Sequence, residues 1–318
     1  MWISPYKYVL SLGHLCSDIN QSILSAVLPF LIATYHYDYT TAAMLVTVSN
    51  VFGAFVQPFI GMLSDKKNKL LYMTLGVLLA SGGMAVTGFI SNFFGLWIVV
   101  IMSGIGVAMF HPQAAKLFNS VSSKNAKGKG MSIFSFGGKV GFTLGPVYTA
   151  FLMNLFGMKG TILFLIPGIV FGIVCSFFNK DFENLDVLEV EKKEKVKSEQ
   201  KDDWSGFIKL CCVVFSRSIL SNGISTFLAF YFIQQFSKPN SFASMLLSVF
   251  YGIGSITLLG GGIADCFGHR KMVRLSFCIF LPAIFIFTNT SHFVIALIML
   301  IFMTCGESLS YSPMVVLG

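Results

Sequence analysis

Charged residues are scarce in this sequence. Aspartate, glutamate, lysine and arginine together make up 11% of the 318 residues, whereas 55% are hydrophobic. Soluble globular domains contain roughly 25% charged residues. The shortage of charge therefore excludes an ordinary soluble domain, and the composition predicts an integral membrane protein.

The sequence also lacks the short motifs of metal-binding and catalytic proteins. Its seven cysteines form no CxxC pattern and fall in apolar runs or in loops predicted to face the inner side of the membrane. We therefore expect neither a metal site nor a disulfide. The sequence contains no nucleophile elbow, phosphate-binding loop or metal-ligand cluster. No cofactor is expected, and an enzyme ranks well behind other functions.

Long apolar runs are abundant instead. A membrane-spanning helix needs about 20 predominantly apolar residues. The candidate spans are residues 6–34, 40–62, 70–91, 93–116, 130–155, 160–178, 207–233, 241–264, 272–290 and 293–317. The first run is interrupted by polar residues, whereas a signal peptide has a cleaner apolar core, so we predict that this run is retained as the first helix. The sequence thus predicts an all-α membrane protein.

One long polar segment separates these spans into two groups. Residues 179–203 are rich in charge and nearly free of aromatic residues, which is typical of a linker. We predict an N-terminal six-helix half over residues 1–178 and an incomplete half of about four helices over residues 204–318. The second half is expected to be about two helices shorter than the first.

The basic residues predict the orientation in the membrane. A net charge of +8 would suggest nucleic acid in a soluble protein, but nearly all the loop cations here lie in residues 63–69, 117–129, 179–203 and 266–274. Loops rich in lysine and arginine face the cytoplasm. We therefore expect no nucleic-acid partner, a multi-pass location in the cell membrane and a cytoplasmic N-terminus.

A short stretch occurs twice, about two hundred residues apart. Residues 61–72 read GMLSDKKNKLLY and residues 261–272 read GGIADCFGHRKM, and each copy lies between two apolar runs. The pattern predicts a tight cytoplasmic hairpin in which a glycine lets two helices approach closely and an acid meets a helix N-terminus or a cation. We assign these loops to conformational gating. The gating residues are Gly61, Asp65, Gly261, Asp265 and Arg270.

The duplicated loop resembles the signature G-x-L-A-D-x-x-G-R-R/K of the major facilitator superfamily, whose members have two parallel halves related by an axis along the membrane normal. Four segments resemble the fosmidomycin resistance subfamily of drug-efflux transporters. They are GHLCSDINQ at 13–21, GIGVAMFHPQAAKL at 104–117, FGGKVGFTLGP at 136–146 and SPMVVLG at 312–318. The resemblance implies a bundle of two pseudo-symmetric six-helix halves and secondary transport. Gln113 stands where that subfamily usually has an acid, and Lys139 where it usually has an asparagine.

Polar residues inside membrane spans are costly and are therefore functional candidates. His14, Asp18 and Gln21 are spaced four and three residues apart, which places them on one helical face. They form either a proton-linked patch, with Asp18 as the carrier and His14 as its neighbour, or a packing contact between helices. His111 could lie at a cavity, or it could simply precede a kink at Pro112.

The charged residues inside the later membrane spans each have two possible roles. Lys139 and Arg217 could attract an anionic group of a substrate, or they could pair with an acid or reach the inner interface. Glu307 could pair with Arg217 or take part in proton coupling. We place Gln21, His111, Gln113, Lys139 and Arg217 at the substrate cavity, and Asp18, His14 and Glu307 in proton coupling.

Two classes of function remain open. The first is a secondary transporter that exports a drug or another small amphiphile in exchange for protons, or that moves another class of small solute. The second is a non-transporting membrane protein, a truncated fragment or partner-binding remnant, which the short second half favours. The expected partners are a small-molecule substrate, protons and the lipid bilayer, and we expect a monomer.

Overall fold

The computed structural model describes residues 5–63, 69–121, 127–178, 204–256 and 267–309. These residues are helical apart from short connections, as the apolar runs predict. The chain divides into two compact units, Met1–Lys197 and Ser198–Gly318. Seven segments of the described ranges are long and apolar enough to cross a membrane.

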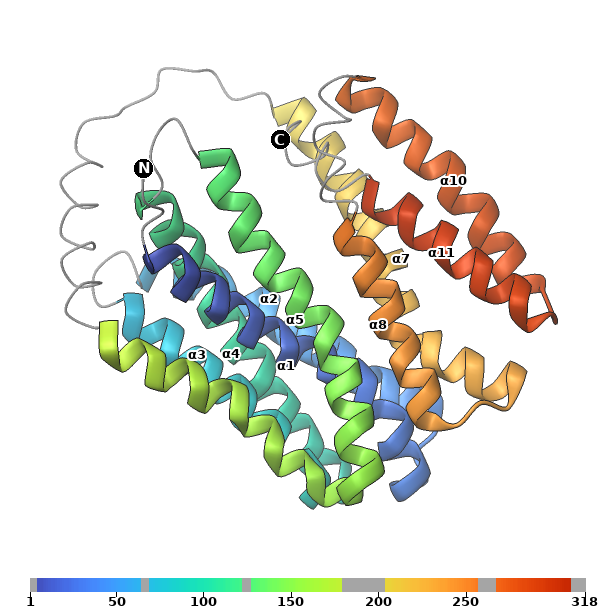
Figure 1. Cartoon of the computed structure of the whole chain (residues 1–318), viewed down its shortest axis with the longest axis horizontal. Helices are drawn as coiled ribbons and strands as arrows, with labels where there is room; N and C mark the ends of the chain where they lie inside the picture. Colours follow the sequence, from blue (N-terminus) through green and yellow to red (C-terminus); the bar gives the residue numbers. More distant parts are fainter. Residues whose placement is uncertain (1–4, 64–68, 122–126, 179–203, 257–266, 310–318) are drawn as a thin grey trace. The chain divides into compact units, whose positions relative to one another are not determined.

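The first unit is a bundle in which α1 and α4 each contact the other long helices. Its helices are α1 (Pro5–Tyr35), α2 (Tyr39–Leu63), α3 (Lys69–Ala85), α4 (Phe93–Val121) and α5 (Lys127–Phe156), with 3-10 helices η1 (Thr87–Phe89) and η3 (Gly157–Leu165) and a further helix over residues 166–178. Helix α1 packs along α5 and also contacts α4, while α2 and α3 both pack on α4. In Figure 1, α1 (blue) and α5 (green) lie side by side.

An aromatic core holds one part of this bundle together. Its buried residues come from α1, α3, α4, α5 and the helix over residues 166–178, and Phe110, Phe118 and Phe171 are each fully buried. Polar side chains add specific links between helices: Asn20 on α1 donates to the hydroxyl of Ser81 on α3 at 2.9 Å. Such interhelical hydrogen bonds fix the register of helices in an apolar environment.

A 3-10 helix forms the beginning of the sixth predicted span. The α-helix begins at residue 166 rather than 160, because η3 separates it from α5. The cause is local: α5 ends before Gly157, which adopts a φ of 57°, and a glycine in this left-handed conformation ends a helix. Tyr148 donates to the carbonyl of Leu163 at 2.6 Å and holds the 3-10 segment against α5.

The second unit has four described helices. They are α7 (Trp204–Phe236), α8 (Asn240–Ile256), α10 (His269–Asn289) and α11 (Phe293–Leu309). Helix α10 packs along α11, and α8 contacts both α7 and α11; the α10 and α11 pair is drawn in orange and red in Figure 1. Phe232 is fully buried, and the Tyr231 hydroxyl donates to the carbonyl of Phe287 at 2.6 Å, so aromatic residues also link these helices.

Candidate functional site

Helix α1 provides a histidine and a carboxylate one turn apart. Nε2 of His14 lies 3.3 Å from Oδ2 of Asp18, a contact that follows from their spacing of four residues on a helix. Asp18 is only 3% exposed. Burial of an unpaired carboxylate would cost several kcal/mol, so partners for this side chain are a physical requirement.

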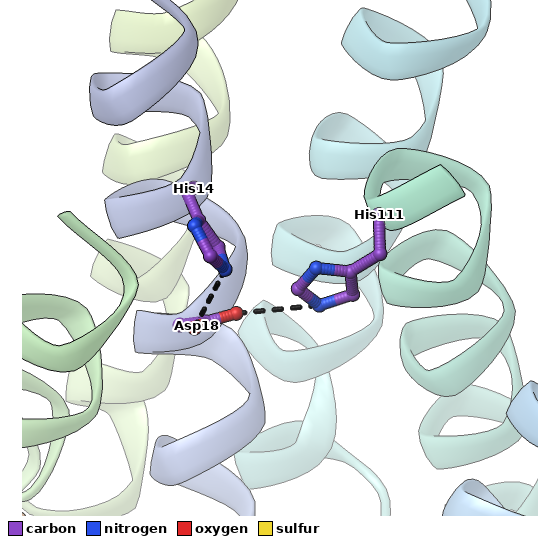
Figure 2. A group of neighbouring side chains, drawn as sticks. All are labelled: His14, Asp18 and His111. Carbon is purple, nitrogen blue, oxygen red and sulfur yellow. Dashed lines mark ion pairs between the residues drawn. The ribbon is translucent and has the colours of Figure 1, made fainter. Parts of the chain in front are cut away.

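Helix α4 supplies the second partner. Nε2 of His111 lies 3.3 Å from Oδ1 of Asp18, so the two carboxylate oxygens face two different imidazole rings. Figure 2 shows the arrangement, with His14 and Asp18 on one helix and His111 reaching across from another. His111 thus contacts the acid and does not merely precede Pro112, which lies inside α4.

Helix α5 closes one side of the site with its backbone at Gly138. A Cβ atom added at Gly138 would lie 2.6 Å from Nε2 of His14, well inside the contact limit of real side chains. The absence of a side chain at Gly138 therefore lets α5 lie directly against the pair. The next residue, Lys139, is half-buried, and its charge acts on His14.

Two further contacts fix the ring of His14. Its Nδ1 lies 2.8 Å from the backbone carbonyl oxygen of Phe134 on α5. The imidazole also stacks on the Phe134 ring, with centroids 4.2 Å apart. His14 is consequently oriented at both ring nitrogens, one toward Asp18 and the other toward α5.

These three side chains form a compact cluster, which we call the His–Asp–His cluster (His14, Asp18 and His111). Their potential ligand atoms lie within 4.8 Å of one another, so a metal ion could fit among them by distance alone. The 3.3 Å separations show that the carboxylate and the imidazoles already contact each other directly. Chemically, the cluster is a buried acid whose two neighbours can each carry a proton.

The second unit contains a buried ion pair of a different kind. Arg217 on α7 donates to the Glu307 carboxylate on α11, and both side chains are largely buried. A small cavity beside the pair is lined by both residues together with Ser276, Phe277 and Phe280. Arg217 and Glu307 are thus paired in this structure, as one of the two interpretations expects.

The comparisons with known proteins identify the family. The family model of the Major Facilitator Superfamily matches residues 10–318. The chain belongs to the Major Facilitator Superfamily. Members of this superfamily are transporters, so the expectation that the protein is not an enzyme is confirmed.

Individual relatives of the superfamily agree with this assignment. The chain is 23% identical over 276 residues to the fosmidomycin resistance protein of Escherichia coli (strain K12), covering 83% of this chain and 66% of that protein. It is 28% identical over 148 residues to the multi-drug resistance efflux pump PmrA of Streptococcus pneumoniae, covering 45% of this chain and 36% of the pump. The chain thus spans about two thirds of the length of the first relative.

The fold is also that of solved superfamily structures. A bacterial homologue of the human lysosomal transporter Spinster, in an inward-facing and occupied conformation, matches with a TM-score of 0.78 at 16% identity. The match covers 98% of this chain and 73% of that structure. The predicted all-helical superfamily fold is therefore confirmed.

The predicted cavity residues separate into different environments. Gln21 is exposed and lies outside the His–Asp–His cluster, although it shares a helical face with Asp18. Gln113 is fully buried, and its amide donates to the carbonyl of Ile60 on α2 at 3.3 Å. Gln113 therefore joins α4 to α2 in this conformation.

The superfamily loop residues are described only in part. Asp65, Gly261 and Asp265 lie outside the described residues, and Arg270 is exposed at the beginning of α10. A Cβ atom at Gly61 would meet no atom within 4 Å, so among the described residues no helix approaches this glycine closely.

One residue near the loop was missed by the sequence-based interpretation. Nζ of Lys116 on α4 donates to the carbonyl of Gly61 at 3.1 Å, within the last turn of α2. A cation at a helix C-terminus is favoured by the helix dipole. The signal was available, since Lys116 follows Gln113 by three residues and both therefore face α2.

Proposed function

We propose that the protein is a proton-coupled exporter of a small amphiphilic or drug-like solute, in which Asp18 is the principal proton carrier. The observation that supports this role is the position of Asp18, which is 3% exposed and lies between imidazoles from two helices. Ionisable residues within membrane spans mark ion pathways. Histidine neighbours change their charge near neutral pH, which suits a site that exchanges protons.

The solute class rests on the relatives. The printed names of the two relatives described above refer to fosmidomycin resistance and to multi-drug efflux. Their identities of 23% and 28% leave the solute of this chain open, and we infer outward transport of a small drug-like molecule as the common chemistry.

The proposed cycle alternates access to one central site. Superfamily members move their two halves about a binding site near the middle of the membrane. Asp18 would take up a proton when the site faces the side of higher proton concentration and release it when the site faces the other side. Solute binding would favour the deprotonated site, because the solute and the proton compete for it.

The replacement of Asp18 by asparagine tests the proposal. The amide cannot ionise and so resembles the protonated carboxyl. Asp18→Asn should abolish drug resistance in cells expressing the protein and proton release on solute addition, while expression and solute binding persist. Glu307→Gln makes the same chemical change in the second unit, and we expect proton release to persist there; because this change also unpairs Arg217, both variants are compared per amount of folded protein. Uphill efflux by Asp18→Asn in a pH gradient would contradict the proposal and transfer the coupling role to Glu307 or His111.

The orientation is a separate part of the proposal. We infer that the N-terminus and residues 179–203 are cytoplasmic, because the basic loops lie on that side. Single cysteines introduced into residues 179–203 of a variant without native cysteines should react with an impermeant maleimide only after the cells are opened. Labelling of intact cells from outside would reverse the orientation.

A further inference from the structure

The hydrogen-bonding partners of His14 determine where its protons lie. A backbone carbonyl oxygen can only accept a hydrogen bond. Because Nδ1 of His14 is 2.8 Å from the carbonyl oxygen of Phe134, Nδ1 must carry a hydrogen and donate it. In the neutral ring the other nitrogen then has no hydrogen. Nε2 of neutral His14 is therefore an acceptor.

The ionised Asp18 carboxylate, which faces Nε2 of His14, is also an acceptor. Oδ2 of Asp18 lies 3.3 Å from Nε2 of His14, and a carboxylate has no hydrogen to donate. Neutral His14 and ionised Asp18 would thus present two lone pairs to each other in a buried position. The contact becomes attractive only when one additional proton is present, either on Nε2 or on the carboxyl.

We propose that the Phe134 carbonyl makes His14 and Asp18 a joint proton site, which holds one proton between Nε2 and Oδ2 and whose side chains separate when that proton leaves. This inference rests on the proposed function, since it specifies how the proposed carrier holds its proton. The balance is simple: the loaded pair, either imidazolium with carboxylate or neutral imidazole with carboxylic acid, becomes neutral imidazole, carboxylate and one proton released to water. The proton on Nδ1 stays in place throughout.

The charged groups around His14 and Asp18 determine where the Asp18 carboxylate moves after the shared proton leaves. His111 faces Asp18 from α4, and Lys139 on α5 acts on His14. After the shared proton leaves, His111 is the imidazole that can still donate to Asp18, because its Nε2 faces Oδ1 at 3.3 Å. Proton release therefore shifts the carboxylate from a bridge between two rings to a contact with α4.

The hydrogen positions of His14 can be measured without transport. Purified protein labelled with ¹⁵N-histidine would be titrated in lipid nanodiscs containing a chelator, since a bound metal ion would select the same tautomer. The His14 resonances are assigned with the His14→Asn variant. At high pH we expect hydrogen on Nδ1 only, and at low pH on both nitrogens. A neutral ring with hydrogen on Nε2, which is the tautomer favoured in water, would overturn the inference.

Two amide substitutions test the consequence for function. In His14→Asn the amide can replace Nδ1 and donate to Phe134, but nothing replaces Nε2. In His14→Gln the amide can reach the Nε2 position and donate permanently to Asp18, without a proton to release. We expect the pH profile of transport to shift in His14→Asn and transport to be lost in His14→Gln.

The joint proton site and the proposed function can be disproved separately. A wild-type pH profile in His14→Asn would show that His14 only supports α5, and the inference would be wrong. If Asp18→Asn abolished coupling while His14 carried its hydrogen on Nε2, the proposed function would stand and the joint proton site would not. If His14 showed the Nδ1 tautomer and Asp18→Asn still coupled, the proposed function would fail instead.

Discussion

Among the described residues, each unit of the protein buries one carboxylate, and the two differ in what neutralises it. Asp18 faces two imidazoles in the first unit, whereas Glu307 faces the guanidinium of Arg217 in the second. Arginine keeps its charge at every physiological pH, while histidine changes its charge near neutrality. The comparison suggests a physical rule: a buried carboxylate forms a permanent ion pair with arginine, whereas histidine partners suit the proton exchange proposed for Asp18.

The largest expected effect comes from removing the permanent partner. Arg217→Ala leaves the Glu307 carboxylate buried without its cation, and breaking a buried pair in this way costs about 3–5 kcal/mol. The thermal unfolding midpoint of the purified protein should fall sharply. The double variant Arg217→Leu/Glu307→Leu should recover most of the loss, because it removes both charges. An unchanged midpoint in Arg217→Ala would mean that the ion pair contributes nothing to the second unit.

A smaller loss of stability is expected when Gly138, which packs against the His–Asp–His cluster, is changed. In Gly138→Ala the new Cβ would lie 2.6 Å from Nε2 of His14, and overpacking of this kind costs about 1–3 kcal/mol. The variant should lower the unfolding midpoint and disturb the pH profile of transport together. The control is Gly82→Ala on α3, where a Cβ meets no atom within 4 Å. Equal effects of the two substitutions would contradict the close packing of α5 on the cluster.

The smallest expected loss of stability is that of a histidine substitution in the first unit. His111→Gln keeps a donor of similar reach beside Asp18, and His14 remains in place. The loss of stability should therefore be about 1 kcal/mol. The same neutral replacement in the second unit, Arg217→Gln, should cost several times more because it leaves an uncompensated charge. Parallel thermal unfolding of the two variants provides the measurement. Equal losses would show that the two carboxylates are neutralised in the same way.

The sequence predicts the local parts of this picture well. Apolar runs predict the helices because every membrane-spanning segment must satisfy its own backbone, and the contact of His14 with Asp18 follows from helical spacing. His111 could only be named as a candidate, since its contact with Asp18 depends on how α1 and α4 pack. Gln21 shares a helical face with Asp18 but is exposed, because periodicity gives the face of a residue and not what covers it.

The sequence did not predict features that depend on local backbone conformation or on contacts between distant residues. Residues 160–165 are apolar enough to begin a span, yet they form part of η3. The left-handed conformation at Gly157 is a tertiary outcome that composition does not reveal. Similarly, Arg217 and Glu307 are 90 residues apart, so their pairing was one of several arrangements that the sequence allowed.

The glycine-lined contact between α1 and α5 has a mechanical consequence. At Gly138 and Gly141 the backbone of α5 meets α1 directly, because these two residues have no side chains to interlock with the ridges of its neighbour. Small sliding movements of packed helices are a recognised form of conformational change, and a smooth interface offers them little resistance. A shear of α1 along α5 by a fraction of a turn would move Nδ1 of His14 away from the Phe134 carbonyl and free the ring to rotate. The same surface that aligns the histidine in one conformation would thus release it in the next.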